Sequence, residues 1–340
     1  MTDAKKIKIA LVGCGGIAQA HWRGIQAHVP ELQVTAVVDS DATRAAEMAA
    51  KTGGEAFTSL EDALAHGDFD AVDIMLPHNQ HEDAAILAFA AHKHVVLEKP
   101  MATTLDGCET IMAAAMKART VFMVAEQSQY WPDAAKIKEL IEEGAIGEVI
   151  TARAFFGGAV GTGWGSKPWR YDKAITGGGI CIDGGAHWIR PLRMWLGEIE
   201  EVVAVTGRPL AEMEGESLAH ALFRFRSGIV ATYDALRAGS FIGPGDEFRV
   251  TGTRGELVIE KGSEGRLLLY TKETPTGQVI LDKKQEGRNA AFGYELKDFA
   301  RSVLYGTALQ SGPVDSLGEL RTALAIYRSA ESGRWEKVWA

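Results

Sequence analysis

Short apolar runs alternate with amphipathic segments through the first third of the chain. The runs are rich in Val, Ile and Leu, and the segments between them have helical periodicity. Continuous apolar strands that alternate with helices indicate a parallel sheet covered on both faces. We therefore expect residues 1–125 to form a doubly wound α/β domain. The expected strands are Ile7–Val12, Gln33–Val38, Ala71–Leu76, His94–Leu97 and Val121–Val124, and the expected helices are Ile17–His28, Thr43–Lys51, Glu82–Ala91 and Asp106–Lys117.

The pattern changes near Glu126. After one helical segment, Ala134–Glu143, several strands alternate apolar and polar positions, as antiparallel strands with one solvated face do. We expect residues 126–340 to form an α+β domain with a large, mainly antiparallel sheet and C-terminal helices within 291–330. The expected strands are Val149–Phe156, Glu200–Thr206, Leu218–Arg226, Ile229–Leu236, Glu247–Thr251, Glu256–Glu260 and Arg266–Tyr270.

The composition favours a small-molecule partner. The formal net charge of −9 comes without any run of basic residues, so the chain lacks the electrostatic footprint for nucleic acid or an anionic membrane. No apolar segment approaches the roughly 18 residues that cross a bilayer, and we expect a cytoplasmic protein. The three cysteines, Cys14, Cys108 and Cys181, lack metal-ligand spacing, so we expect neither a disulfide nor a metal site.

A glycine-rich turn joins the first expected strand to the first expected helix. It carries a G-x-G-x-x-A string formed by Gly13, Gly15, Gly16, Ile17 and Ala18. In a dinucleotide fold the first glycine allows the tight turn, and the second lets the backbone approach a pyrophosphate. The small residue at the end of the string lets helix and sheet pack closely. The position of the string therefore favours a dinucleotide site.

Asp39 ends the second expected strand, 21 residues after Ala18. A carboxylate there binds the adenosine ribose hydroxyls and repels a 2′-phosphate. The alternative is that the glycines only make a turn and that Asp39 only caps the following helix. The combined pattern favours NAD as cofactor, with NADP as an alternative because Arg44 lies nearby.

Two further segments follow expected strands of the parallel sheet. Pro77, His78 and His81 come after the strand at Ala71–Leu76, where polar side chains can hold the nicotinamide half of a dinucleotide. The histidines lack partners at metal-ligand spacing, and a loop or capping role is their ordinary alternative. Glu98-Lys99-Pro100 follows His94–Leu97, and we count Glu98 and Lys99 among the cofactor-site residues. The alternative for Lys99 is a solvated surface charge.

A second glycine-rich segment carries an acid and a histidine. Asp183 and His187 follow Gly177-Gly178-Gly179 and stand four residues apart, so on a helix they share one face. The glycines allow the backbone to crowd against a ligand. A buried structural histidine paired with a nearby acid is the alternative.

Taken together, these motifs resemble the Gfo/Idh/MocA oxidoreductase family, named for glucose–fructose oxidoreductase, inositol dehydrogenase and a rhizopine catabolism protein. The resemblance covers nearly the whole chain and includes the Gly13 turn, Glu98-Lys99-Pro100, Glu143–Gly147, Gly177–His187 and Ser329–Gly333. It implies an N-terminal dinucleotide fold and a C-terminal open-faced sheet that often mediates homodimers or homotetramers. It also implies a sugar or cyclic polyol as substrate, and Lys99, Asp183 and His187 as the catalytic set.

The chemistry fits these residue types. Oxidising a secondary alcohol removes the hydroxyl proton while hydride leaves the same carbon, and a histidine suits that proton transfer near pH 7. We assign His187 as general base, or general acid in reduction. Lys99 is expected to stabilise the developing alkoxide, although the two roles can also be exchanged. Asp183 is expected to hold a substrate hydroxyl or to orient the imidazole.

The segment after His187 departs from the family pattern. The family usually continues H-x-x-D, whereas Arg190 stands here. A guanidinium can bind an anionic group on the substrate, and the alternative is a salt-bridged structural arginine. Further substrate-binding candidates are Trp164, Trp169 and Arg170, although tryptophan is also ordinary packing material. We expect 157–165 to be a mobile loop, either a lid or a plain surface connection.

Three functions compete. An NAD-dependent dehydrogenase or reductase of sugars, polyols or their derivatives leads. The second is an NAD-dependent enzyme that cleaves glycosides through transient oxidation at C3, which uses the same residues. The third is a non-enzymatic NAD-binding regulator, against which the presence of Lys99 and His187 argues.

Overall fold

The computed structural model describes residues 6–159, 168–240, 242–285 and 287–340. The chain divides into two compact units, and each unit is built from two separate segments of the sequence. The first comprises Met1–Gln127 with Asn289–Leu317, and the second comprises Ser128–Arg288 with Gly318–Ala340. The first crossover lies close to the expected boundary at 125/126. Each unit is described below by itself.

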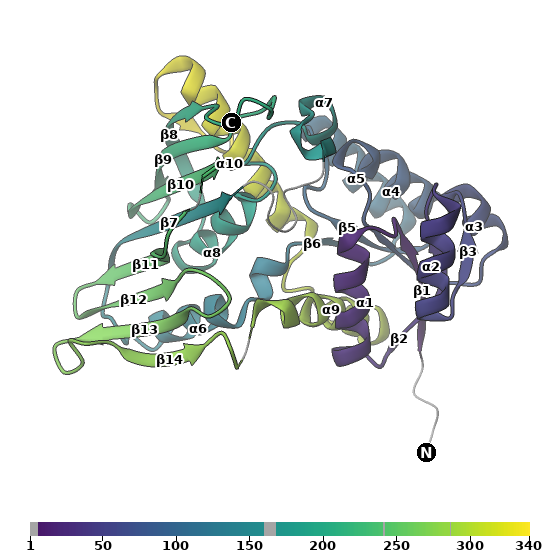
Figure 1. Ribbon diagram of the computed structural model, residues 1–340, viewed down its shortest axis with the longest axis horizontal. Helices are drawn as coiled ribbons and strands as arrows, with labels where there is room; N and C mark the ends of the chain where they lie inside the picture. The colour runs from purple at the N-terminus through teal and green to yellow at the C-terminus, as the bar shows by residue number, and fades with distance from the viewer. Residues whose placement is uncertain (1–5, 160–167, 241, 286) are drawn as a thin grey trace. The chain divides into compact units, whose positions relative to one another are not determined.

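The described part of the first unit contains a six-stranded parallel sheet (Figure 1). Its strand order is β3-β2-β1-β4-β5-β6, and every pairing is parallel. The strands are β1 (Ile7–Val12), β2 (Leu32–Val38), β3 (Glu55–Phe57), β4 (Ala71–Ile74), β5 (His94–Glu98) and β6 (Phe122–Ala125). The order reverses between β1 and β4, and ligands of doubly wound sheets bind outside the carboxyl ends of the strands at such a point.

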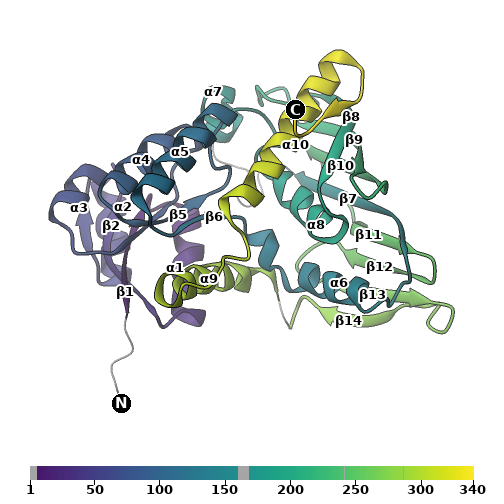
Figure 2. The ribbon, with the colours of Figure 1, turned by 180° about the vertical axis from the view of Figure 1, so that it is seen from behind.

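Helices cover both faces of this sheet, as its continuous apolar strands require. Helices α1, α2 and α9 lie on one face, and α3, α4 and α5 lie on the other (Figure 2). Their bounds are Gly16–His28 for α1, Ala42–Thr52 for α2, Leu60–His66 for α3, His81–Ala90 for α4, Leu105–Ala118 for α5 and Ala291–Tyr305 for α9. The expected doubly wound domain is confirmed, whereas β3 and α3 were not predicted.

Helix α9 belongs to the first unit, although we expected 291–330 to close the second domain. Its backbone approaches α1 closely where Gly24 meets Gly293. A Cβ added at Gly24 would stand 2.7 Å from the Gly293 nitrogen, so two glycines are needed for the helices to pack. Helix α10 (Pro313–Ser332) then spans the third crossover, between Leu317 and Gly318.

The described part of the second unit contains a nine-stranded mixed sheet. Its order is β14-β13-β12-β11-β7-β10-β9-β8-β15, and the pairing of β7 with β10 is parallel while the others are antiparallel. The strands are β7 (Val149–Ala159), β8 (Ile199–Gly207), β9 (Leu218–Phe225), β10 (Val230–Ala238), β11 (Asp246–Gly252), β12 (Gly255–Glu260), β13 (Arg266–Thr271), β14 (Gln278–Asp282) and β15 (Glu336–Lys337). The expected mainly antiparallel sheet is confirmed.

The faces of this sheet differ. Helices α6 (Pro132–Glu142) and α8 (Ala186–Leu196) pack on one face, with a single turn, α7 (Lys173–Thr176), before α8. On β9 and β10, buried residues such as Phe223 and Tyr233 alternate with exposed ones such as Leu222.

The homodimer or homotetramer implied by the family resemblance stays a prediction. None of the described helices is both long and apolar enough to cross a membrane.

The contact between α1 and α9 predicts a large effect of one methyl group. We expect Gly24→Ala to lower the free energy of unfolding by about 1–3 kcal/mol through overpacking, even though alanine favours helix. Urea unfolding measures this change. Gly239→Ala is the control, because a Cβ there meets no atom within 4 Å. An unchanged or higher stability of Gly24→Ala would contradict the close approach.

Candidate active site

The glycine turn after β1 forms a cradle open to a ligand. Gly13 has a φ of +92°, and a Cβ there would lie 2.6 Å from the Met75 carbonyl oxygen, so this position needs glycine. At Gly15, by contrast, a Cβ would meet no atom within 4 Å. Gly15 is also the N-cap of α1 and provides no side-chain cap. The first N–H groups of α1 therefore face a space that suits a pyrophosphate.

Asp39 is held firmly at the end of β2. One carboxylate oxygen accepts the Cys14 N–H at 2.9 Å, and the other accepts the Asp41 N–H at 2.9 Å and the Arg44 guanidinium at 2.7 Å. Burial by itself raises the pKa of Asp39, but these hydrogen bonds outweigh it and lower the pKa below its ordinary value. Asp39 is thus an ionised carboxylate tied to the glycine turn, and these residues fit the adenosine half of NAD.

The two histidines after β4 are less accessible than the sequence suggested. His78 begins a short 3₁₀ turn (His78–Gln80) and is buried. His81 is fully buried, with Nδ1 2.8 Å from the Pro100 oxygen and Nε2 2.9 Å from the Leu76 oxygen. Burial lowers the pKa of His81, so its neutral ring donates to one of these carbonyls at a time. The ring of His81 thus braces two backbone segments, and its expected place in the cofactor wall stays a prediction.

Lys99 follows directly on β5 at the carboxyl edge of the sheet. The Glu98 carboxylate accepts the backbone N–H of Lys99 at 3.1 Å, and the Lys99–Pro100 peptide is cis. Glu98 itself is buried and Lys99 is half-buried. Glu98 thus supports the turn that carries Lys99.

Asp183 and His187 both belong to the second unit, but they do not lie on one helix. Asp183 lies in a run of turns before α8, and His187 lies in the first turn of that helix. Between them, Gly184 packs so tightly that a Cβ would stand 2.6 Å from the Phe156 ring, and the helix starts only at Ala186. The expectation of a shared helix face is therefore wrong.

The other substrate candidates differ in their surroundings. Arg170, in the 3₁₀ turn Pro168–Tyr171, forms an ion pair with Asp183, and its guanidinium lies 4.5 Å from the Trp169 ring centre. Trp164 lies outside the described residues, as do residues 160–165 of the expected loop. Residues 157–159 belong instead to the end of β7.

Arg190 points into the unit rather than toward solvent. Its guanidinium is buried and donates to Glu319 at 2.8 Å, and the same carboxylate pairs with Arg193. Glu319 therefore accepts two arginines of α8. This geometry matches the structural alternative for Arg190.

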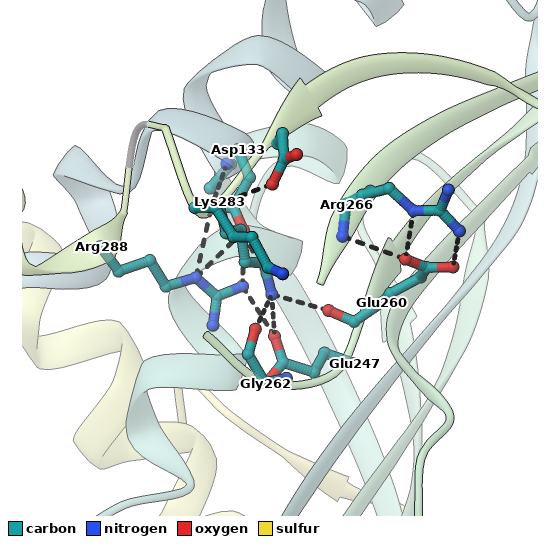
Figure 3. Close-up of polar contacts among 10 residues, drawn as sticks. Asp133, Glu247, Glu260, Gly262, Arg266, Lys283 and Arg288 are labelled. Atoms are coloured by element: carbon teal, nitrogen blue, oxygen red, sulfur yellow. Dashed lines mark hydrogen bonds and ion pairs between the residues drawn. The ribbon is translucent and has the colours of Figure 1, made fainter. Parts of the chain in front are cut away.

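A buried charged cluster missed from the sequence supports the aromatic residues near His187. Trp131 packs with its ring centre 6.2 Å from that of His187, and the Arg288 guanidinium lies 3.7 Å from the Trp131 ring centre. Arg288 also donates to Asp133 at 2.8 Å and to Glu247 at 2.9 Å (Figure 3). The stack and its ion pairs fix the wall behind His187.

Lys283 completes this cluster. Its ammonium donates to Glu247 at 3.0 Å and to the Glu260 carbonyl at 2.7 Å (Figure 3). Burial lowers the pKa of Lys283, and the nearby Arg288 adds to the effect. Spacing could not reveal this cluster, because its members come from segments up to 155 residues apart.

Comparisons with known proteins agree with this architecture. Residues 7–126 match the family model described as oxidoreductase family, NAD-binding Rossmann fold, and residues 134–258 match the GFO/IDH/MocA C-terminal domain. The chain is 30% identical to 1,5-anhydro-D-fructose reductase of Ensifer adhaerens, over 90% of this chain and 91% of the relative. It is 26% identical to inositol 2-dehydrogenase of Rubrobacter xylanophilus, with 99% and 94% covered.

A solved oxidoreductase from Thermotoga maritima superposes with a TM-score of 0.86 at 28% identity, covering 98% of this chain and 99% of that one. Fold, cofactor turn and both matched domains lead to one assignment. The chain belongs to the Gfo/Idh/MocA family of NAD-binding oxidoreductases.

Proposed function

We propose that this protein transfers hydride between NAD and a secondary alcohol or ketone of a sugar, cyclic polyol or sugar derivative. The observation that carries the proposal is the placement of Lys99. It follows β5 at the carboxyl edge of a sheet whose glycine turn and Asp39 fit NAD. The relatives named above, a reductase of anhydrofructose and a dehydrogenase of inositol, act on compounds of this class.

The proposed mechanism gives separate tasks to two side chains. NAD, when bound, supplies the carbon that accepts or gives the hydride. His187 removes the hydroxyl proton in oxidation and returns it in reduction. Lys99 donates a hydrogen bond to the reacting oxygen and stabilises its negative charge. The roles of Lys99 and His187 are separable by mutation.

Asp183 and Arg170 are proposed to act as a pair that binds substrate hydroxyls. Their ion pair offers both a donor and an acceptor in a fixed arrangement. Arg190, by contrast, is proposed to hold α8 through Glu319 rather than to bind the substrate. A neutral carbohydrate is accordingly the preferred substrate class.

A substrate screen tests the function directly. Sugars, inositols, anhydrosugars, glycosides and sugar acids are incubated with NAD and NADP in parallel, and the reverse reactions with the reduced cofactors, while absorbance of the reduced nicotinamide is followed. We expect a response from at least one neutral polyol or sugar. Glycoside cleavage without net reduction of NAD would favour the C3-oxidation alternative, and no turnover of any kind would overturn the proposal.

Removing the ammonium of Lys99 is expected to slow the reaction and to leave the binding of the cofactor nearly unchanged. In Lys99→Met we expect kcat/KM to fall by about 10²–10⁴-fold, because the alkoxide loses its donor. The Kd for NAD, measured by tryptophan fluorescence, should change much less. Lys93→Met is the matched control, since Lys93 precedes the same strand and its ammonium donates to the Phe69 carbonyl. Full kcat in Lys99→Met would refute the assigned role.

His187→Asn is expected to lower kcat by about 10²-fold or more and to remove the pH dependence that belongs to the general base. The pH profile of kcat measures this change. His220→Asn serves as the control, because His220 is exposed and pairs with Asp234 on the sheet. An unchanged profile in His187→Asn would assign the base to another residue.

Asp39 is expected to set the preference for NAD. In Asp39→Ala the carboxylate that opposes a 2′-phosphate is lost and Arg44 is released to bind one, so the Kd ratio of NADP to NAD should fall by about tenfold or more. Calorimetric titration with both cofactors measures the ratio. Asp41→Ala removes a neighbouring carboxylate that also pairs with Arg44 and should leave the ratio nearly unchanged. Equal ratios in both variants would contradict the role of Asp39.

A further inference from the structure

A buried group of ionisable side chains lies within the first unit around His21 of α1. The His21 side chain is fully buried, and so are those of Asp73 in β4 and Glu295 in α9. Glu98, at the end of β5, reaches the same histidine. Asp73 stands in a central strand of the sheet, where an acid is costly unless it is paired. The protonation state of each side chain in the group therefore has to be established.

Both ring nitrogens of His21 face carboxylate oxygens. Nδ1 lies 2.8 Å from Asp73 Oδ2, and Nε2 lies 3.2 Å from Glu98 Oε1. A neutral imidazole can donate from only one nitrogen, whereas the imidazolium donates from both. Burial by itself lowers the pKa of His21, but the surrounding carboxylates raise it well above its ordinary value. His21 is thus a buried cation.

Glu295 does not compete strongly for this cation. Its nearer oxygen lies 3.7 Å from His21 Nε2, and neither oxygen has a hydrogen-bond partner among the described residues. Burial raises the pKa of Glu295 well above its ordinary value, against the effect of His21, and Glu98 and the buried Glu126 raise it further. Glu295 is therefore a neutral acid, and the charge of His21 is shared between Asp73 and Glu98.

Glu98 connects this cation to the backbone of Lys99. Oε1 faces His21 Nε2, and Oε2 accepts the Lys99 N–H at 3.1 Å. Both oxygens of one carboxylate are thus committed, which fixes the orientation of the carboxylate and of the peptide that it holds. His81 also acts on Glu98 and Lys99, and its ring is neutral and braces the Pro100 carbonyl.

We propose that His21 is a positioning residue for Lys99 and acts through Glu98. The imidazolium keeps the Glu98 carboxylate ionised and oriented, and the carboxylate in turn holds the main chain from which the Lys99 side chain projects. The effect on turnover rests on the proposed function, because only there does Lys99 touch the substrate. The link from His21 to Glu98 can be tested without any substrate.

Titration of Glu98 in His21→Gln is the direct test. Glutamate labelled with ¹³C at the δ carbon reports each carboxyl by NMR, and loss of one signal in Glu98→Gln assigns Glu98. We expect the titration midpoint of Glu98 to rise by about one pH unit or more in His21→Gln, because the carboxylate loses its cation. His28→Gln, on the same helix and packed on Tyr294, is the matched control and should leave the midpoint in place.

Turnover supplies a second and separate readout. The acid limb of the kcat profile should move to higher pH in His21→Gln, while the Kd for NAD changes much less. If the titration midpoint of Glu98 rises but no alcohol or ketone reacts in any variant, the proposed function fails and the link from His21 to Glu98 stands. If Glu98 titrates as in the wild type while stability falls, His21 is only a structural ion pair and the inference is overturned.

If His21→Gln does not fold, a double variant that removes equal positive and negative charge takes its place. His21→Gln combined with Asp73→Asn removes one cation and one anion together, which avoids leaving Asp73 as an unpaired buried carboxylate. Glu98 still loses the charge next to Oε1, so the same upward shift is expected. A wild-type midpoint in this double variant would likewise overturn the inference.

Discussion

The carboxyl ends of parallel strands lie at one edge of a sheet, and the placement of the candidate site residues in the first unit depends on this constraint. Gly13 follows β1, Asp39 follows β2 and Lys99 follows β5. The edge brings these residues together although they are far apart in the sequence. Hydrogen bonds then refine the arrangement, since the Asp39 carboxylate accepts the Cys14 N–H within the glycine turn. The glycine turn and Asp39, the acid proposed to bind the ribose, are thereby one rigid piece.

In each unit, buried charged groups contact the proposed catalytic residue or the side chain packed against it. His21 and Glu98 stand behind Lys99, while Arg288 stacks on Trp131 beside His187. Such pairs contribute little net stability, because desolvation offsets their attraction. They do restrict side chains to one orientation, which a reaction that needs aligned donors requires. These pairs thus contribute precise placement of the side chains rather than stability.

The sequence was sufficient for the elements with strong periodicity and for the motifs tied to turns. The strand Ile7–Val12 has the expected bounds, and the Gly13 turn and Asp39 lie where the fingerprint requires. Elements as short as β3 and β14 have too few residues to show a period. The four-residue spacing of Asp183 and His187 places them on one face only if both lie on a helix, and spacing alone cannot reveal that Asp183 lies in a turn before α8. The burial of His81 and the partners of His21 depend on tertiary contacts, which no local pattern encodes.

Hydrogen–deuterium exchange with and without NAD tests most directly whether the carboxyl edge of the parallel sheet is the cofactor site. The account predicts slower exchange in peptides that contain the turn after β1, the end of β2 and the Lys99 turn. Peptides from the amino ends of the same strands and from β9 and β10 should exchange as before. Protection confined to other segments, or no protection at saturating NAD, would contradict the account.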